Sequence, residues 1–399
     1  MLTKAVSRLE HLEVIKVISS GIIRQMAVNS TPKQYSLLHL GKYYPPHMGG
    51  MEIHLQQLIR GQSTTIDVAA IVAGDARRTQ VESLDGAKIT RVASFGVIAS
   101  MPVCPGLTSA IRRSPADLVH IQMPNPGAAL AFLMSGHSGK LIVTHQADII
   151  GRKLLRRLSD PIVDRLMKRA ARIIVTTARY RDSSSELKTF RDKCRVVPLG
   201  IDIQQAATAD PLVVRQIRQQ YGDRLILAVG RLVPYKGFDV LIRAMKQVDA
   251  KLLIIGTGPM HDVLTRLITT ENVSGKVTLQ GHVENIRPYF AAASFFAFPS
   301  VTRAEAFGIV QLEAMAAGLP VINTNIESGV EDISLDGKTG ITVPPGDENA
   351  LAQAMQLLLN REDLRRQYGE AARERAWAEF SADMMCVRTM KVYDEVLST

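Results

Sequence analysis

Two glutamates, Glu305 and Glu313, lie eight positions apart in the segment RAEAFGIVQLEAMAAG, Arg303–Gly318. A helix that begins near Phe307 or Gly308 would direct unpaired backbone N–H groups, at the positive end of its dipole, toward an anion. Glu313 would then lie roughly 7 Å farther along the helix, from the rise per residue. This is about the separation of a diphosphate from the ribose that carries it, and a carboxylate accepts both ribose hydroxyl hydrogen bonds. The spacing indicates a nucleoside diphosphate site, with a surface helix carrying two ordinary glutamates as the alternative.

A basic loop follows the apolar strand LILAVG. The sequence GRLVPYKG places Arg231 and Lys236 five residues apart in this loop. Two cations can clamp a diphosphate and stabilise the charge that develops on it as a leaving group. A solvated basic loop is the alternative. Gly256, in the turn IIGTGP after another strand, and Gly308 would let a phosphate or sugar approach the backbone closely.

The N-terminal half offers two further candidates. Gly49 and Gly50, in YYPPHMGGMEIHL, open a helix after the first apolar strand, and the backbone N–H groups of such a helix start can bind an anion. A plain turn is the competing interpretation. His145, in VTHQAD, ends an apolar strand and could hydrogen-bond a sugar or organise the reacting centre. A structural histidine is the alternative for this position.

Residue spacings typical of metal sites are missing from the sequence. No Asp-x-Asp pair occurs, and Cys104, Cys194 and Cys386 match no metal-ligand or disulfide spacing. Enzymes that hold a sugar nucleotide through a divalent metal usually need such a carboxylate pair. We therefore expect no metal and no cofactor, and diphosphate binding by Arg231, Lys236 and helix N-termini. The isolated cysteines indicate a reducing, cytoplasmic compartment.

The elements that must position these residues alternate between short apolar strands and amphipathic helices, which is typical of α/β domains with parallel sheets. The first series of expected strands is YSLLHLG, IDVAAIVAG, KITRVA, DLVHIQ, KLIVTHQ, RIIVTT and CRVVPLG, and the second is RLILAVGRL, KLLIIGTGP, KVTLQGHV, FFAFPS and LPVINTN. The pattern predicts two Rossmann-like domains, residues 35–203 and 204–380. Ligands bind such domains at the carboxyl ends of their strands.

Both ends of the chain lie outside these two series. Residues 350–359, 361–380 and 382–397 are expected to form helices, and about 381–399 is assigned to the first domain. Residues 1–34 form an extension with an internal Met26. A true translation start at Met26 and an amphipathic helix that touches the membrane both remain open. Apolar pieces of this extension are interrupted by Lys16, so we expect neither a secretory signal nor a membrane span.

The net charge of +10 favours an anionic partner. Much of the excess lies in Arg152–Arg172, where a helix would place Leu154, Leu155, Leu158, Ile162 and Leu166 on one apolar stripe. A solvated helix that packs one face on its domain and a helix docked on an acidic membrane surface are both open. With 5% aromatic residues and no reading motif, nucleic acid is not an expected partner.

The ordered motifs resemble those of the retaining glycosyltransferases of family four, which have the GT-B fold. The resemblance covers the chain from Tyr35 onward and rests on GGMEIHL, VTHQAD, VVPLGID, GRLVPYKG, IIGTGP, AEAFGIVQLEAMAAGLPVI and GKTGITVPPGD. Bacterial polysaccharide mannosyltransferases are the most similar group. One departure from the family pattern is Glu331, in ESGVEDISLDG, where a proline is common.

The resemblance implies roles for single residues. Arg231 and Lys236 would hold the donor diphosphate, Glu313 the ribose, and Glu305 would lie beside the transferred sugar. Backbone contacts to the sugar and phosphate would come from Phe307, Gly308, Ile309 and Val310. In the first domain, Gly49 and Gly50 would contact phosphate, and His145 would lie near the reacting centre of the sugar. It also implies retention of anomeric configuration, a cleft between the two domains and a last helix that crosses back to the first.

We therefore expect a hexosyltransferase that uses GDP-mannose in preference to a UDP-sugar. Its acceptor would be lipid-linked or a surface polysaccharide, and the protein would be cytoplasmic, with peripheral contact at the inner face of the plasma membrane through Arg152–Arg172. A soluble enzyme that makes small glycosides and a non-catalytic scaffold of a polysaccharide assembly complex are alternatives. Two other enzyme classes are disfavoured. A GT-B epimerase lacks the glutamate segment, and a Rossmann dehydrogenase would have a G-x-G-x-x-G after the first strand, which this sequence does not.

Overall fold

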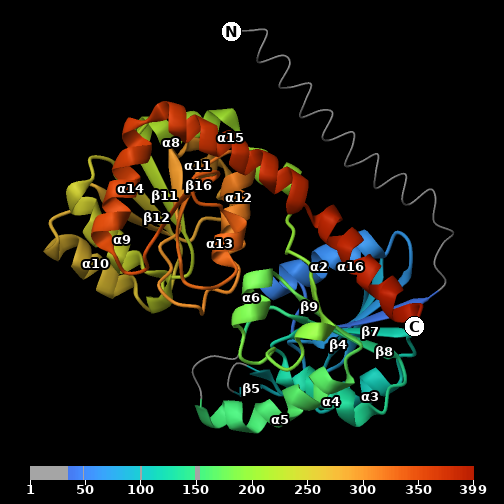
Figure 1. The fold of residues 1–399 in the computed structure, drawn as a ribbon. Coiled ribbons are helices and arrows are strands. Elements are labelled where there is room, and N and C mark those ends of the chain that lie inside the picture. The colour runs from blue at the N-terminus through green and yellow to red at the C-terminus, as the bar shows by residue number, and fades with distance from the viewer. Residues whose placement is uncertain (1–34, 48, 99–100, 149–152) are drawn as a thin grey trace, which may run out of the picture. The chain divides into compact units, whose positions relative to one another are not determined.

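The computed structural model describes residues 35–47, 49–98, 101–148 and 153–399, which form two compact units (Figure 1). The first unit holds the described residues up to Val175, Glu186–Gly200 and Ala382–Thr399. The second holds Thr176–Ser185 and Ile201–Ser381. Residues 176–185 and 201–203 were expected from the sequence to lie in the first domain. In the structure, both segments group with the second unit. The extension 1–34 lies outside the described residues.

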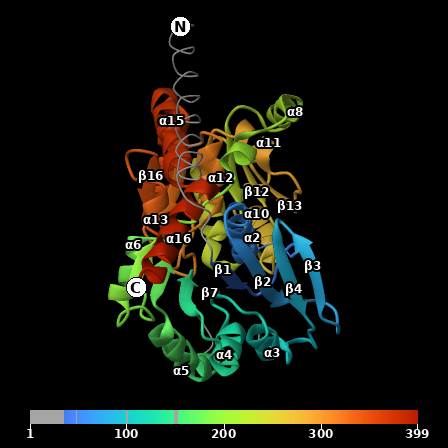
Figure 2. The same cartoon turned by 90° about the vertical axis from the view of Figure 1, so that its right-hand side faces the viewer.

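The first unit is built on an eight-stranded sheet in the order β10-β9-β8-β7-β1-β2-β4-β3. Its strands are β1 (Ser36–Leu40), β2 (Asp67–Ala73), β3 (Gln80–Leu84), β4 (Ala87–Val92), β7 (Leu118–Met123), β8 (Lys140–His145), β9 (Arg172–Val175) and β10 (Cys194–Val196). All neighbours are parallel except β3 and β4, an antiparallel pair at the outer edge (Figure 2). The central strands are buried along most of their length, as parallel strands covered on both faces must be.

Helices cover both faces of this sheet (Figures 1 and 2). On one face lie α3 (Leu107–Arg112), α4 (Pro126–Ser135) and α5 (Lys153–Arg169), and on the other α2 (Gly50–Gln62) and α16 (Ala382–Leu397). A small hairpin, β5 (Val97–Ile98) with β6 (Met101–Pro102), precedes α3, and the 3₁₀ helix η1 (Arg191–Lys193) precedes β10. Asn125 and the αL residue Gly136 cap α4 at its two ends, which is why this helix has sharp limits.

The last helix, α16, is part of the core of the first unit. Its side chains Met385, Val392, Tyr393 and Val396 are buried together with residues of α2, β1 and β2. The Tyr393 hydroxyl lies 2.6 Å from Nδ1 of His120 and accepts a hydrogen bond from Gln62 at 3.2 Å. These contacts confirm that the C-terminal helix returns to the first unit.

The second unit has a six-stranded parallel sheet in the order β13-β12-β11-β14-β15-β16. Its strands are β11 (Leu225–Val229), β12 (Lys251–Ile255), β13 (Val277–Gly281), β14 (Phe295–Ala297), β15 (Val321–Thr324) and β16 (Gly340–Val343). This is the 3-2-1-4-5-6 order of a dinucleotide-binding fold, which reverses direction between β11 and β14. In such sheets ligands bind at the carboxyl ends of the strands on either side of the reversal.

Helices again cover both faces of the sheet (Figure 1). One face is packed by α9 (Phe238–Ala244), α10 (His261–Thr270) and α14 (Glu348–Asn360), which share an apolar core with β11 and β12. The other helical segments are α6 (Ala178–Ser183), α7 (Ile203–Ala207), α8 (Pro211–Tyr221), η2 (Pro234–Lys236), η3 (Met245–Gln247), α11 (Arg287–Ala292), α12 (Val310–Ala316), α13 (Val330–Ile333) and α15 (Glu362–Glu379). The two sheets confirm the α/β class and the two Rossmann-like halves expected from the sequence.

Two details correct the expectations. The helix after the glutamate segment begins at Val310, two to three residues later than predicted, because Gly308 has a positive φ of 76° that cannot continue a right-handed helix. The antiparallel edge strand β3 was not expected, since QVESL is mostly exposed and lacks an apolar face.

The helix α5 carries the basic stretch, of which the side chains from Ser159 onward are described. Leu166 and Met167 are fully buried, whereas Arg165 and Lys168 are exposed. Lys193 Nζ donates hydrogen bonds to the carbonyl of Lys168, near the end of the helix, at 2.8 Å and to that of Ala170, just after it, at 2.9 Å. This end of the apolar stripe therefore packs on its own unit, while Arg165, Lys168 and the acidic Asp164 face solvent. No helix within the described ranges is both long and apolar enough to cross a bilayer.

Candidate functional site

The loop after β11 carries the two cations expected to bind a diphosphate. Arg231 is exposed in this loop, and Lys236 ends η2, with only 11% of its side chain exposed. The Lys236 ammonium lies 4.8 Å from the ring centroid of Phe298, which directly follows β14. Loops from both sides of the strand-order reversal therefore meet at Lys236.

Lys236 forms an ion pair with Glu305, a contact that the sequence did not indicate. Only 11% of the Glu305 side chain is exposed, and its Oε2 also accepts a hydrogen bond from Ser300 Oγ at 3.3 Å. Removing two charges from water is unfavourable unless they are paired and hydrogen-bonded, as they are here. The residue expected at the diphosphate and the residue expected at the sugar are thus direct neighbours.

Gly256 lets the turn after β12 lie directly against the turn after β11 at the carboxyl ends of these strands. A Cβ at this position would lie 1.9 Å from the carbonyl oxygen of Gly230, and its φ of 149° is open only to glycine. The Gly256 N–H donates to Gly281 O at 2.8 Å, while Leu232 N–H donates to Thr257 O at 2.8 Å. The turns after β11, β12 and β13 are therefore tied together through their backbones, which holds Arg231 at the strand ends.

The segment from Phe307 to Val310 leads into α12. Gly308 takes its positive φ against the Phe298 ring, where a Cβ would come within 2.8 Å of two ring carbons. Within the part of the chain that the structure describes, the backbone N–H groups of Phe307, Gly308, Ile309 and Val310 have no hydrogen-bond acceptor. Lys236 lies against the same Phe298 ring, and unpaired backbone donors of this kind suit an anion.

Glu313 lies in the first turn of α12, between the buried residues Leu312 and Ala314. Desolvation by the surrounding protein raises the pKa of its carboxyl from 4.5 to about 7. Among the described residues, no hydrogen-bond donor contacts this carboxylate.

Replacing Glu313 with glutamine is expected to remove a pH-dependent part of the stability. The unfolded chain releases the Glu313 proton near pH 4.5, whereas the folded chain keeps it to about pH 7. The folded state binds the proton more tightly, so this group favours folding at low pH, and its contribution is lost as the pH rises through that window. Urea unfolding of the two proteins across the window measures the difference. The exposed Glu374→Gln is the control, and a wild-type-to-variant difference that does not change with pH would contradict the assignment.

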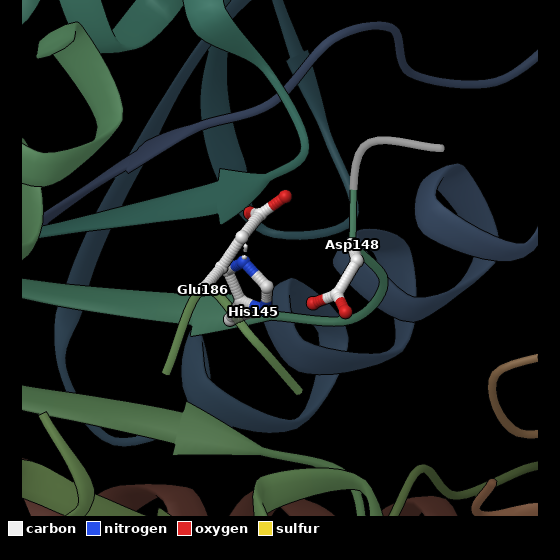
Figure 3. A group of neighbouring side chains, drawn as sticks. All are labelled: His145, Asp148 and Glu186. Atoms are coloured by element: carbon white, nitrogen blue, oxygen red, sulfur yellow. Dashed lines mark hydrogen bonds and ion pairs between the residues drawn. The ribbon is translucent and has the colours of Figure 1, made fainter. Parts of the chain in front are cut away.

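In the first unit, His145 is the last residue of β8, and its backbone pairs with Met123 of β7 and Val175 of β9. Its side chain is 1% exposed, and its Nε2 lies 3.0 Å from Oε2 of Glu186 (Figure 3). Asp148, three residues farther on, completes a group whose nitrogen and oxygen atoms all lie within 4.8 Å of one another.

Gly49 and Gly50 lie at the start of α2, after β1, as expected. Gly49 is the N-cap residue with an extended φ of −160°, which any residue can adopt. The Glu52 carboxylate lies over this helix start, since a Cβ on Gly49 would come within 2.4 Å of its Oε2. A phosphate at this helix start would therefore meet a carboxylate of the same chain.

The predicted residues fall into two groups, each within one unit. The second unit brings together the residues after β11, β12 and β14, namely Arg231, Lys236, Gly256, Glu305, Phe307, Gly308, Ile309, Val310 and Glu313. The first unit holds Gly49, Gly50 and His145. Sequence reasoning missed Ser300 and Glu186. Glu186 carries no signal, because it is 41 residues from His145 in a stretch without regular structure.

Comparison with known proteins also divides the chain into an N-terminal and a C-terminal part. The family model "Glycosyl transferases group 1" matches residues 213–375, and "Glycosyl transferase 4-like domain" matches residues 49–200. The "D-rhamnosyltransferase WbpZ" of Pseudomonas aeruginosa is 30% identical over 272 residues, which cover 67% of this chain and 70% of that protein. The chain belongs to the group 1 glycosyltransferases.

Two further relatives extend the likeness over nearly the whole glycosyltransferase. The "O-antigen chain mannosyltransferase C" of Escherichia coli is 28% identical over 369 residues, 91% of this chain and 99% of that protein. The structure of sucrose-phosphate synthase from Thermosynechococcus elongatus superposes with a TM-score of 0.74 at 20% identity, covering 92% of this chain and 100% of that one. The glycosyltransferase therefore has the GT-B fold expected from its motifs.

Proposed function

We propose that this glycosyltransferase moves a hexose from a nucleotide sugar, with GDP-mannose favoured over a UDP-sugar, to a lipid-linked or surface-polysaccharide acceptor. The observation that carries the donor half is the anion site at the reversal between β11 and β14. There, Lys236 and Gly308 both lie against the Phe298 ring, and the backbone N–H groups of residues 307–310 have no acceptor among the described residues. The mannose preference rests on the name of the Escherichia coli relative, and that of the Pseudomonas relative supports a rhamnose donor as the second candidate.

In the proposed site, positive groups bind the diphosphate and a carboxylate binds the ribose. Arg231 and Lys236 hold the diphosphate together with the N–H groups of residues 307–310, and Glu313 accepts the ribose hydroxyls. Because Lys236 is already paired with Glu305, a diphosphate that reaches Lys236 brings its sugar next to the Glu305 carboxylate. This arrangement assigns charge neutralisation to side chains and backbone donors, so the reaction needs no metal and no cofactor.

Transfer is proposed to retain the anomeric configuration. The bond from the anomeric carbon to the diphosphate oxygen breaks while the acceptor oxygen bonds to the same face of the sugar. The acceptor proton passes to the departing phosphate oxygen, whose developing charge Lys236 and Arg231 stabilise. His145 is assigned to the sugar near this centre, and Gly49 and Gly50 to the phosphate.

The full chain, purified and incubated with GDP-mannose, GDP-rhamnose, UDP-glucose or UDP-N-acetylglucosamine, tests the donor assignment. Release of GDP from GDP-mannose is expected to exceed release from the other donors and to persist in EDTA. Proton NMR of the product measures the anomeric configuration. An inverted product would contradict the retaining mechanism, and turnover that EDTA abolishes would contradict a metal-free site. If no donor is turned over, the proposed activity is wrong. Complementation by Glu305→Ala in cells would support a scaffold instead.

Peripheral membrane contact is part of the proposal. Phe95, Val97 and Ile98 expose 60, 60 and 70% of their surface at the β5–β6 hairpin. Arg165 and Lys168 are exposed on α5, which packs against α4 in the same unit. Exposed apolar side chains and exposed cations in one unit suit an anionic bilayer surface, where each interaction strengthens the other.

The variant Ile98→Ser is expected to release the protein from vesicles that contain anionic lipid. The substitution removes an exposed apolar side chain and leaves the fold intact. Co-sedimentation with phosphatidylglycerol vesicles at low and high salt measures the effect, with Val263→Ser, at an exposed position of the second unit, as the control. Salt should weaken binding of both proteins because the basic helix acts through screened charges. Equal binding of Ile98→Ser and wild type would contradict a role for the hairpin.

A further inference from the structure

Glu186 has no role in the donor contacts described above, yet it is tightly joined to His145. The Glu186 side chain is 9% exposed, and its carboxylate meets the His145 imidazole at 3.0 Å (Figure 3). An ionised carboxylate can only accept a hydrogen bond, so this contact places a proton on Nε2 of His145. A partner of this kind fixes both the tautomer and the orientation of an imidazole.

The position of Glu186 in the chain gives the contact a second consequence. His145 is held in the sheet between β7 and β9, and β9 ends at Val175. The next ten residues, 176–185, belong to the second unit, and Glu186 is the first residue back in the first unit. The partner of His145 is therefore joined by one peptide bond to a segment anchored on the other unit.

The anchors of this segment are residues next to the donor site. Arg303 Nη2 donates to Ser183 O at 2.7 Å, and Arg303 lies two positions before Glu305. Arg179 pairs with Glu331 at 3.2 Å and with Asp332 at 3.3 Å. Residues 176–185 are therefore held to the second unit by Arg303 and by the carboxylates of Glu331 and Asp332.

Resting on the proposed function, we propose that Glu186 is a positioning residue that orients His145 for transfer, and that the 176–185 segment, through Arg179, makes this orientation depend on the second unit. A displacement of about 1 Å at a catalytic group can cost on the order of 100-fold in rate. Loss of the Glu186 contact should therefore act on turnover and leave donor binding largely intact.

The test is a double-mutant cycle on the full chain with the donor that the wild type turns over. Glu186→Ala is expected to lower kcat by about 10- to 100-fold with little change in the KM for the donor. Glu186→Gln, which keeps a hydrogen-bond acceptor, should lie closer to the wild type. In the His145→Ala background, Glu186→Ala should have no further effect, because residues that act as a unit are not additive. Arg179→Ala should lower kcat by less than Glu186→Ala, and should likewise have no effect once His145 is removed.

Matched controls separate positioning from folding. Glu82→Ala removes a carboxylate paired with Arg91 at 2.6 Å in the same unit, and Arg361→Ala removes a surface pair with Asp363 at 2.8 Å. Both should retain wild-type kcat, and circular dichroism should show every variant folded. Wild-type kcat in Glu186→Ala, an additive effect with His145→Ala, or equal losses in Glu186→Ala and Glu186→Gln would overturn the assignment.

A bound cation is the other use of these side chains that the test must detect. Asp148 lies with His145 and Glu186 in a group of three metal-ligand types (Figure 3). Loss of activity in EDTA that Mn²⁺ or Zn²⁺ restores would overturn positioning by a hydrogen bond in favour of a metal site. Absence of turnover in the wild type would remove the proposed function itself, which is distinguishable from an active enzyme that tolerates Glu186→Ala.

Discussion

Replacing Lys236 with methionine is expected to lower kcat/KM for the nucleotide sugar by about 100- to 1000-fold, the usual cost of removing one preorganised donor to a developing negative charge. The methionine keeps the apolar stem against the Phe298 ring and removes only the ammonium. It also leaves the Glu305 carboxylate nearly buried with Ser300 as its remaining hydrogen-bond donor. Initial rates of nucleotide release over a range of donor concentrations measure the loss.

Two further variants show which part of that loss is chemical. Lys246→Met removes an exposed lysine that pairs with Glu271 at 2.9 Å, and its rates should match those of the wild type. Breaking a buried ion pair costs about 3–5 kcal/mol, because the remaining charge is unpaired. The double variant Lys236→Met/Glu305→Gln should recover that stability in urea unfolding while its rate stays low. A rate that recovers together with stability would assign Lys236 a structural role only.

Replacing Gly256 with alanine is expected to unfold the second unit or to destabilise it by more than about 4 kcal/mol, the range reserved for severe steric or backbone conflicts. The added Cβ would meet the Gly230 carbonyl oxygen at 1.9 Å, and neither atom can rotate away, because the backbone fixes the position of both. Urea unfolding followed by circular dichroism measures the loss.

Gly275→Ala is the matched control, because a Cβ there has no heavy atom within 4 Å and the backbone is not in the glycine-only region. It should be at least as stable as the wild type, since alanine restricts the unfolded chain. A Gly256→Ala protein with normal stability would show that the turns after β11 and β12 can separate, contrary to the hydrogen bonds that join them.

The sequence predicted most of the strands, and the positions of Arg231 and Lys236 after one of them, because both leave local signals. Apolar runs such as KLIVTHQ became buried strands, and Arg231 and Lys236 could be placed at a strand end by the residues immediately before them. Gly308 was predicted to matter through close approach of a ligand. The structure adds that its positive φ delays the start of α12.

The remaining parts depend on contacts between distant residues. The pairing of Lys236 with Glu305 joins positions 69 residues apart, and that of His145 with Glu186 joins positions 41 apart. Neither glutamate differs in its neighbourhood from an exposed one, so composition and periodicity could not reveal their burial. The exposed strand β3 was missed for the opposite reason, since its pairing with β4 is stabilised by backbone hydrogen bonds and not by an apolar pattern.

The return of α16 to the first unit also sets the order in which the protein can mature on the ribosome. Strand β1 is synthesised long before Met385, Val392 and Val396, which belong to the core around it. The second unit, complete at Ser381, can close first. The nascent first unit must therefore wait with an uncovered apolar face, and a chain that stalls before residue 382 would present that face to chaperones and proteases.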